Sequence, residues 1–316
     1  MKIKVLDKKS LGDDTPFEAL YALGEVEVYD ATPASLAPER VADADVVIIN
    51  KVKITDEVIS AAKNLKLVCV FATGFDNIDL DSARRHGVAV CNVPGYSTES
   101  VALYTVATVT ALCARLIDYR SFVNSGEYTA SGVPNRLVPV YHEIAGKKWG
   151  IIGYGNIGKA VGRVAEALGA ELVVNKRTPV PGVRCVDVDT LCRECDIITL
   201  HCPLNDGTRR IINEERLSLM KDGVIIVNEA RGAVLDEQAV TDAVLSGKIG
   251  GFGCDVYSVE PFGTDHPYNK LLDLSNVILT PHAAWGSYES RKRCMEIIVE
   301  NIKSFYSGEK LNRVDI

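Results

Sequence analysis

The sequence has no excess of positive charge: 35 Lys and Arg residues stand against 42 Asp and Glu residues, a formal net charge of −7. No broad basic field is available, which argues against nucleic acid as the main partner. The N-terminal stretch MKIKVLDKKS has only a short apolar run with charges inside it, so we expect no signal peptide there. The uncharged segment 100–114 is too short and too rich in Thr to span a bilayer. We therefore expect a cytoplasmic protein with no membrane partner.

The sequence also has little of the paired cysteine spacing that is typical of metal sites. Cys192 and Cys195 form one C-x-x-C pair, and no second pair accompanies it. The nine cysteines are expected to stay reduced, and cysteines beside an apolar strand usually pack as small hydrophobic residues. We expect no metal site, and the sequence leaves the role of these two cysteines open.

What the chain does have is a regular alternation of short apolar runs and helical segments, which indicates βα units and parallel sheets. Its 316 residues, 47% hydrophobic and 24% charged, suit a globular protein of two domains. Strands are expected at 2–6, 26–29, 44–50, 67–71, 88–91, 149–152, 171–175, 197–201, 223–228, 250–255 and 277–279. Helices are expected at 17–23, 55–63, 80–86, about 98–117, 157–168, 214–220, 237–245 and 288–306.

The order of these elements predicts two lobes. Residues 118–147 are more polar and indicate an excursion from the core. The last helix has one apolar face and no strand follows it, so we expect it to return to the first lobe. We predict an α/β fold with two Rossmann-like or flavodoxin-like lobes, parallel sheets and a cleft between them. Residues 1–98 plus 286–316 would form the substrate lobe, and residues 99–285 the dinucleotide-binding Rossmann lobe.

A glycine-rich turn follows the strand at 149–152. Gly153, Gly155 and Gly158 have G-x-G-x-x-G spacing, with Asn156 and Ile157 opening the next helix. At a strand-to-helix turn the three glycines allow a tight turn, close approach of a pyrophosphate and close helix packing, in that order. The helix N-terminus adds an anion site. We predict dinucleotide binding, the alternative being a merely tight turn.

The next strand indicates which dinucleotide binds. An NAD enzyme usually ends this strand with an acidic residue that holds the ribose 2′-hydroxyl. Here the strand ends in Asn175, Lys176, Arg177 and Thr178. Two adjacent cations suit a 2′-phosphate, so we favour NADP as the cofactor, with NAD still possible.

Three stretches late in the chain follow predicted strands, where open α/β sheets place their ligands. They are 228–232, 254–261 and 280–285, and they carry Arg231, Glu260 and His282. A histidine can protonate the alkoxide formed when a ketone is reduced. A carboxylate beside it fixes its tautomer, and an arginine can grip a substrate carboxylate in a bidentate pair. Each residue alone is more often structural, but the three together predict a catalytic site.

At this point the chain resembles the D-2-hydroxyacid dehydrogenase family over nearly its whole length. The resemblance rests on GYGNIG, HCPLN, NEARG, CDVYSVEP and TPHAAW in order, and on FATGFDNID and NVPGYSTESVA before them. Within the family the chain looks most like hydroxypyruvate/glyoxylate reductases (glycerate dehydrogenases), partly because Trp285 follows His282.

The resemblance implies roles for particular residues. Arg231 would orient the substrate, Glu260 would be the partner carboxylate and His282 the acid/base. Asp255 would bind the nicotinamide carboxamide. Further cofactor contacts are implied at Thr105, His201, Cys202, Pro203, Thr208 and Ala230, and substrate contacts at Thr73, Gly74 and Trp285. The family is typically homodimeric, with the excursion 118–147 at the interface. Departures from its pattern are Lys176, Leu103, and Glu229 where Thr or Val is usual.

We thus expect an enzyme that reduces a small 2-oxo acid, such as hydroxypyruvate or glyoxylate, with NADPH. One alternative is another member of the family acting on 3-phosphoglycerate or lactate-like acids, for which Lys51 and Lys53 supply two cations. A second alternative is a dinucleotide-sensing binding protein of the corepressor kind. The sequence leaves the particular 2-hydroxy acid and the physiological direction open.

Overall fold

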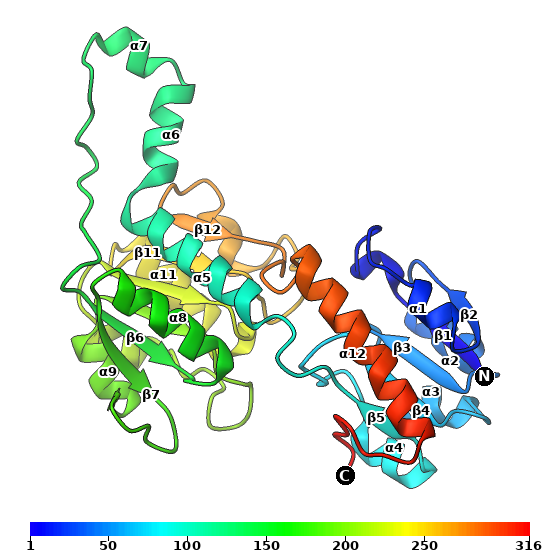
Figure 1. Ribbon diagram of the computed structural model, residues 1–316. Helices are drawn as coiled ribbons and strands as arrows, with labels where there is room; N and C mark the ends of the chain where they lie inside the picture. Colours follow the sequence, from blue (N-terminus) through cyan, green and yellow to red (C-terminus); the bar gives the residue numbers. More distant parts are fainter. The chain divides into compact units, whose positions relative to one another are not determined.

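The computed structural model describes residues 1–316, which form two compact units (Figure 1). Unit 1 consists of Met1–Ser97 and Gly286–Ile316, and unit 2 consists of Thr98–Trp285. The first segment of unit 1 ends at residue 97, one residue before the boundary expected from the sequence. Each unit is built on a sheet in which every strand pair is parallel, so the predicted α/β class with two Rossmann-like sheets is confirmed.

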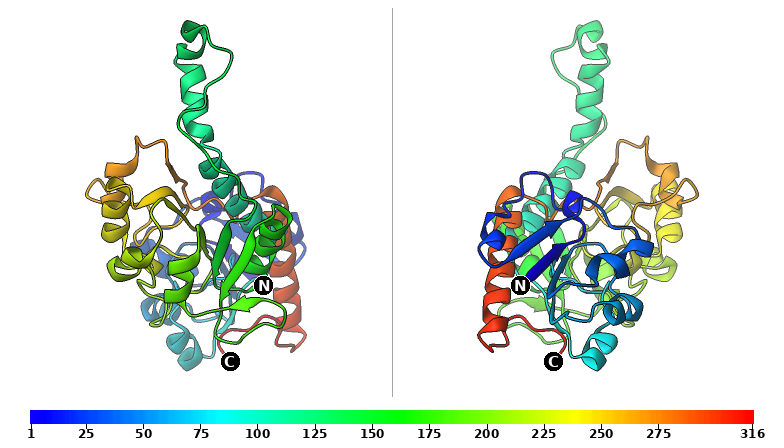
Figure 2. Two further views of the ribbon diagram at one scale, coloured as in Figure 1. Left: turned by 90° about the vertical axis from the view of Figure 1, so that its left-hand side faces the viewer. Right: turned by 90° about the vertical axis from the view of Figure 1, so that its right-hand side faces the viewer.

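Unit 1 has a five-stranded sheet in the order β2-β1-β3-β4-β5. Its strands are β1 (Lys2–Val5), β2 (Glu25–Val28), β3 (Val46–Ile49), β4 (Leu67–Val70) and β5 (Ala89–Cys91). Its helices are α1 (Glu18–Tyr21), α2 (Ala37–Val41), α3 (Asp56–Ala61), α4 (Leu80–His86) and α12 (Tyr288–Tyr306). The central strands β3 and β4 are buried throughout, because α2, α3 and α4 pack on one face and α12 on the other (Figure 2). This two-sided burial explains their continuous apolar sequences.

The terminal helix α12 is fixed to unit 1 by polar contacts as well as by its apolar face. The buried Asn301 amide donates to the Asn92 carbonyl oxygen at 2.9 Å. The Arg291 guanidinium pairs with the Asp14 carboxylate, with 3.0 Å between Nη2 and Oδ2. The Arg293 guanidinium donates to the Tyr96 carbonyl at 3.0 and 3.1 Å. The last helix of the chain is therefore part of the same unit as the first strands.

Unit 2 has a seven-stranded sheet in the order β12-β11-β10-β9-β6-β7-β8. Its strands are β6 (Lys148–Ile152), β7 (Glu171–Asn175), β8 (Arg184–Cys185), β9 (Ile197–Leu200), β10 (Val224–Asn228), β11 (Ile249–Cys254) and β12 (Val277–Leu279). Its helices are α5 (Thr98–Cys113), α6 (Leu116–Asn124), α7 (Glu127–Ser131), α8 (Asn156–Ala167), α9 (Val188–Glu194), α10 (Glu214–Leu219) and α11 (Glu237–Leu245). Helices α5 and α8 cover one face, and α9, α10 and α11 cover the other. The strand order reverses at β6, which is where such sheets bind their ligands.

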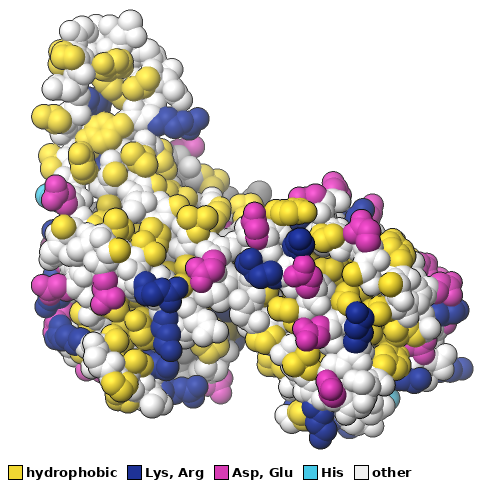
Figure 3. Space-filling model, in the orientation of Figure 1, with side chains coloured by type: hydrophobic (Ala, Val, Ile, Leu, Met, Phe, Trp, Pro, Cys, Tyr) yellow, Lys and Arg dark blue, Asp and Glu magenta, His cyan; other side chains and the backbone are white.

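Helix α5 is shorter than the sequence suggested. It ends at Cys113 instead of residue 117, because Arg115 takes a left-handed backbone conformation (φ 55°) and the chain turns by 65° into α6. Together α6, α7 and the irregular segment 132–143 form an arm that extends from the sheet of unit 2 (Figure 1). Apolar side chains gather on the surface of this arm (Figure 3). No single helix is long and apolar enough to cross a membrane, although α5 and α6 meet that test as a bent pair.

Candidate active site

The glycine loop after β6 has the geometry of a phosphate cradle. A side chain at Gly153 (φ +95°) would lie 2.5 Å from the Cys202 nitrogen, and one at Gly158 would lie 2.3 Å from the Gly153 carbonyl oxygen. These two positions must therefore be glycine for the turn and the helix to pack. At Gly155, by contrast, the added atom would meet nothing within 4 Å. Gly155 is the N-cap of α8 and supplies no capping side chain, so the first N–H groups of the helix, which include those of Asn156 and Ile157, have no capping partner. Such a helix N-terminus is suited to bind an anion.

The end of β7 presents the two predicted cations to solvent. Lys176, Arg177 and Thr178 are exposed, and neither cation forms an ion pair with another residue of the chain. Asn175 has a different task, because its amide donates to the Val186 carbonyl at 2.9 Å and ties the strand end to the next segment. The structure therefore leaves Lys176 and Arg177 available for an anionic ligand and gives Asn175 a structural contact.

The segment after β9 begins with two side chains that are shielded from solvent, His201 and Cys202. Both ring nitrogens of His201 are shielded from solvent and have no protein partner, and burial lowers its pKa to about 3, so the ring is neutral. The Cys202 thiol is buried as well, which raises its pKa to about 11. The Thr208 hydroxyl donates to the Pro203 carbonyl at 2.6 Å and closes the loop on itself. These residues thus line the sheet end, with Thr208 engaged within its own loop.

Asp255, directly after β11, holds the segment that carries the histidine. Its Oδ1 accepts from the Thr280 hydroxyl at 2.6 Å and from the Ala283 N–H at 2.8 Å, and its Oδ2 accepts from the Ala284 N–H at 2.9 Å. A carboxylate has about four acceptor directions, so roughly one remains on Oδ2. Asp255 therefore has a structural role that the sequence did not reveal, besides any contact with a ligand.

The predicted acid/base histidine and its predicted partner carboxylate lie next to each other. The Nδ1 atom of His282 lies 2.7 Å from Oε2 of Glu260, and both side chains are about one quarter exposed, at 24% and 28%. Oε1 of Glu260 accepts from the Tyr257 N–H at 3.0 Å, which fixes the carboxylate. His282 itself has a left-handed backbone (φ 54°), and its N–H donates to the Thr280 carbonyl. With Nδ1 facing a carboxylate, the proton of the neutral ring rests on Nδ1, and Nε2 is the atom that can exchange a proton with a ligand.

Arg231 lies on the neighbouring strand end. It follows β10, which pairs with β11, so all three predicted catalytic residues come from the adjacent ends of β10, β11 and β12. The Asn228 side chain brackets this turn, since its amide donates to the Arg231 carbonyl and its oxygen accepts from the Ala230 N–H, both at 3.0 Å. One guanidinium nitrogen of Arg231 donates to the Ala230 carbonyl at 2.9 Å. The backbone at Arg231 is thereby fixed.

The remaining predicted residues are spread over both units. Thr73 and Gly74 follow β4 of unit 1, and the Thr73 hydroxyl donates to the Val93 carbonyl at 2.8 Å. Thr105 is fully buried in α5 and its hydroxyl donates to the Val101 carbonyl at 2.8 Å, so it is engaged within its own helix. Trp285 is the last residue of unit 2, and the Ser100 hydroxyl donates to the neighbouring Ala284 carbonyl at 2.6 Å.

Several further side chains have structural contacts or positions. The side chain of His266 is only 8% exposed, and its Nε2 lies 3.1 Å from Oε2 of Glu237. Its Nδ1 accepts from the Tyr268 N–H, so Nε2 carries the proton. Thr55 is the N-cap of α3 and makes no side-chain capping bond. Cys192 and Cys195 lie in the apolar core around α9, where burial raises the pKa of each thiol to about 12.

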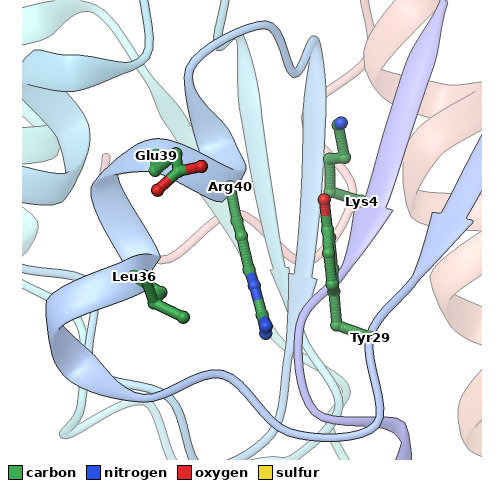
Figure 4. Close-up of a pocket in the computed structure, with 5 residues that line it drawn as sticks. All are labelled: Lys4, Tyr29, Leu36, Glu39 and Arg40. Atoms are coloured by element: carbon green, nitrogen blue, oxygen red, sulfur yellow. The ribbon is translucent and has the colours of Figure 1, made fainter.

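A separate pocket in unit 1 does not belong to this site. It is lined by Lys4, Tyr29, Leu36, Glu39 and Arg40 (Figure 4). The Arg40 guanidinium stacks on the Tyr29 ring at 4.2 Å and donates to the Thr32 hydroxyl at 2.6 Å. Lys4 pairs with the carboxylates of Glu27 and Asp43. Lys4 therefore has carboxylate partners, whereas the contacts of Arg40 are with an aromatic ring and neutral oxygen atoms.

A parallel sheet with a glycine loop at its reversal point, and a histidine–carboxylate pair at neighbouring strand ends, defines a nicotinamide-dependent oxidoreductase. The comparison with known proteins agrees. The family model described as "D-isomer specific 2-hydroxyacid dehydrogenase, NAD binding domain" matches residues 106–284. A hydroxypyruvate reductase from Blautia hydrogenotrophica is 39% identical over the full length of both chains.

Solved structures give the same result. A D-lactate dehydrogenase from Aquifex aeolicus, complexed with NAD and lactic acid, superposes with a TM-score of 0.88 at 31% identity, covering 100% of this chain and 99% of that one. An acyclic imino acid reductase, in complex with NADPH and D-Arg, has a TM-score of 0.86 at 32% identity, covering 99% and 100%. The chain belongs to the D-isomer specific 2-hydroxyacid dehydrogenase family, and it is an NAD(P)-dependent oxidoreductase. The family resemblance found in the sequence is confirmed.

Proposed function

We propose that this enzyme reduces a small 2-oxo acid, hydroxypyruvate or glyoxylate, to the D-2-hydroxy acid. The observation that carries the proposal is the 2.7 Å contact between His282 and Glu260 beside the strand end that bears Arg231. The relative from Blautia hydrogenotrophica, named hydroxypyruvate reductase, supports this choice of substrate. Small substrates also require no further charged subsite, which favours them over a phosphorylated acid.

The residues divide the chemistry among them. The reduced nicotinamide, when bound, supplies the hydride. Protonated His282 gives a proton from Nε2 to the carbonyl oxygen, and Glu260 at Nδ1 stabilises the imidazolium before that step. Arg231 holds the substrate carboxylate and polarises the adjacent carbonyl, with Thr73, Gly74 and Trp285 as further substrate contacts. After the proton is transferred, His282 is neutral and the product leaves as the hydroxy acid.

The cofactor is held by the end of the unit 2 sheet. Gly155 and the N-terminus of α8 bind the pyrophosphate, and Asp255 accepts from the nicotinamide carboxamide at its remaining acceptor position. Six further residues line or support the place of the cofactor along this sheet end: His201, Cys202, Pro203, Thr208, Ala230 and Thr105. Lys176 and Arg177 give a preference for NADP over NAD, because two unpaired exposed cations at the end of β7 match a 2′-phosphate.

The enzyme would act as a cytoplasmic homodimer that forms through the arm. Leu137, Val138 and Val140 are each more than 60% exposed, at 72%, 64% and 69%. Apolar surface gathered in this way usually marks a protein interface. The arm has internal order as well, since the Tyr119 hydroxyl donates to the Pro139 carbonyl at 2.6 Å and Arg136 stacks on the Phe122 ring. An ordered apolar surface suits a permanent partner such as a second copy of the chain.

Steady-state rates with hydroxypyruvate, glyoxylate, pyruvate and phosphohydroxypyruvate, each with NADH and with NADPH, test this proposal. We expect the highest kcat/KM for hydroxypyruvate or glyoxylate with NADPH. Faster turnover of phosphohydroxypyruvate would overturn the substrate, and equal or better use of NADH would overturn the cofactor preference. Binding of the dinucleotide without turnover of any 2-oxo acid would favour a sensing protein instead.

A further inference from the structure

Glu229 is a buried acid that the mechanism above does not use. It follows β10 directly and its exposed fraction is only 8%. Its Oε2 atom is shielded from solvent and has no hydrogen-bond partner. A carboxylate in such a place is costly unless it takes up a proton. The residue therefore needs either a proton or a nearby positive charge.

The sheet register places Glu229 beside Asp255. Asn228 of β10 pairs with Cys254 of β11, so the next residues on the two parallel strands, Glu229 and Asp255, are cross-strand neighbours on the same face. The Asp255 N–H also donates to the Asn228 carbonyl at 3.1 Å, which continues the ladder to this point. Two carboxyl groups side by side in a buried place cannot both be ionised at little cost.

The groups around Glu229 confirm that no cation of the chain balances it. Burial, and then the charge of Asp255, raises the pKa of Glu229 to about 9. From α5, Tyr104 faces the same place. Burial raises the pKa of its hydroxyl, as do the nearby charges of Asp255 and Glu229, while a hydrogen bond with Thr280 acts in the opposite direction. From β11, the buried thiol of Cys254 is also affected by Glu229 and has a raised pKa. These three neighbours, Asp255, Tyr104 and Cys254, are neutral or acidic, and Glu229 holds its proton at neutral pH.

The same edge of the sheet receives the nicotinamide end of the cofactor. The pyrophosphate loop lies after β6, and the ribose-recognition strand β7 lies on one side of it. The other half of the dinucleotide must then run across the opposite side, over β9, β10 and β11. The oxidised nicotinamide ring carries a positive charge, whereas the reduced ring is neutral. A titratable acid at the ends of β10 and β11 therefore distinguishes the two by charge.

We propose that Glu229 sets the balance between oxidised and reduced cofactor: its protonated form favours the reduced dinucleotide and its ionised form favours the oxidised one. This inference rests on the proposed placement of the nicotinamide beside Asp255. Because coupling is reciprocal, binding of the oxidised cofactor releases a proton from Glu229 and binding of the reduced cofactor does not. At neutral pH the residue thus favours the reduced cofactor that a reductase needs.

The test is the ratio of the dissociation constants of NADP⁺ and NADPH, measured by protein fluorescence from pH 6 to pH 10. Effects common to both dinucleotides, such as repulsion of their phosphates, cancel in this ratio. We expect the NADP⁺/NADPH ratio of the wild type to fall by on the order of tenfold as the pH rises through the region where Glu229 ionises. Glu229→Gln keeps the size of the side chain and is always neutral. Its ratio of NADP⁺ to NADPH dissociation constants should therefore lack the fall with pH that is expected of the wild type.

Glu215→Gln, at an exposed position of α10, removes one acidic group elsewhere and should behave as the wild type. If Glu229→Gln does not fold, Glu229→Thr carries the same expectation. Calorimetric titration with NADP⁺ in two buffers of different ionisation enthalpy should show more proton release from the wild type than from the variant. Parallel pH curves for wild type and variant would overturn the inference, while failure to bind NADP⁺, NADPH, NAD⁺ and NADH alike would overturn the proposed function instead.

Discussion

The imidazole of His282 and the carboxylate of Glu260 come from segments 22 residues apart and lie 2.7 Å from each other. The contact depends on the left-handed backbone of His282 (φ 54°) and on the three hydrogen bonds by which Asp255 holds the segment around it. The proposed catalytic pair is therefore built by the loops after β11 and β12.

Replacing His282 by alanine tests the acid/base role. His282→Ala should lower kcat by roughly 100- to 10,000-fold, the usual contribution of a positioned acid/base group. Binding of NADPH should remain, because the glycine loop is untouched. Stopped-flow or steady-state rates and a fluorescence titration measure the two effects. His142→Ala, at an exposed position of the arm, is the matched control. A His282→Ala enzyme of normal rate would contradict the mechanism.

Lys176 and Arg177 should decide the cofactor preference. The double change Lys176→Ala and Arg177→Ala removes contacts to a 2′-phosphate, each worth about 1.5–3 kcal/mol when charged. We expect KM for NADPH to rise tenfold or more, since the loss of even one such contact corresponds to about a tenfold change. KM for NADH is the internal control and should stay nearly constant. If KM for NADPH and KM for NADH rise by the same factor, the two cations do not recognise the 2′-phosphate.

Glu237 should hold the loop that carries Glu260. Its Oε1 accepts from the Ser258 N–H at 2.9 Å, and its Oε2 is paired with the buried His266. Glu237→Ala leaves the buried Nε2–H of His266 without a partner, which costs about 1–3 kcal/mol, and it removes the acceptor of the exposed Ser258 N–H. Urea unfolding should show this loss, and kcat should fall more than cofactor affinity does. Glu237→Gln, which keeps one acceptor oxygen, should recover part of the lost stability and part of the lost kcat.

Glu229 should make stability depend on pH in a defined direction. Its pKa is about 9 in the folded protein, against an ordinary value of 4.5. Between these values the unfolded chain has released the proton and the folded chain keeps it, so stability falls as the pH rises toward 9. The loss should exceed about 1.4 kcal/mol, the free energy that corresponds to one pH unit.

Thermal unfolding of wild type and Glu229→Gln from pH 5 to pH 9 isolates this effect. The variant should become the more stable of the two as the pH rises, since it has no proton to lose. Equal Tm differences at pH 5 and pH 9 would show that Glu229 has an ordinary pKa.

The arm should control assembly. Leu137→Asp combined with Val140→Asp places two charges on its exposed apolar surface, and we expect the proposed homodimer to dissociate to monomers. Analytical ultracentrifugation at several concentrations measures the mass. Leu245→Asp, an exposed apolar position on α11, is the control and should leave the mass unchanged. A monomeric wild type would show that the arm has another partner.

Much of the fold could be predicted from the sequence because its signals are local. β7 and α12 have the expected bounds, since an apolar run or an apolar face shows directly in the order of residues. The short helix α9 was missed, and so was the break after α5, because Arg115 gives no sign of its left-handed backbone.

For the site, the sequence by itself determined the family and the glycine loop. It also predicted the acid/base histidine, its partner carboxylate and the arginine, because their spacing relative to the strands is a property of the chain. Only the tertiary structure decided which groups touch. It showed that Asp255 holds the histidine segment, that His266 is buried against Glu237, and that Glu229 lies beside Asp255 without a cation. Burial and cross-strand neighbours depend on how distant segments pack, and those quantities set the charge of a buried acid.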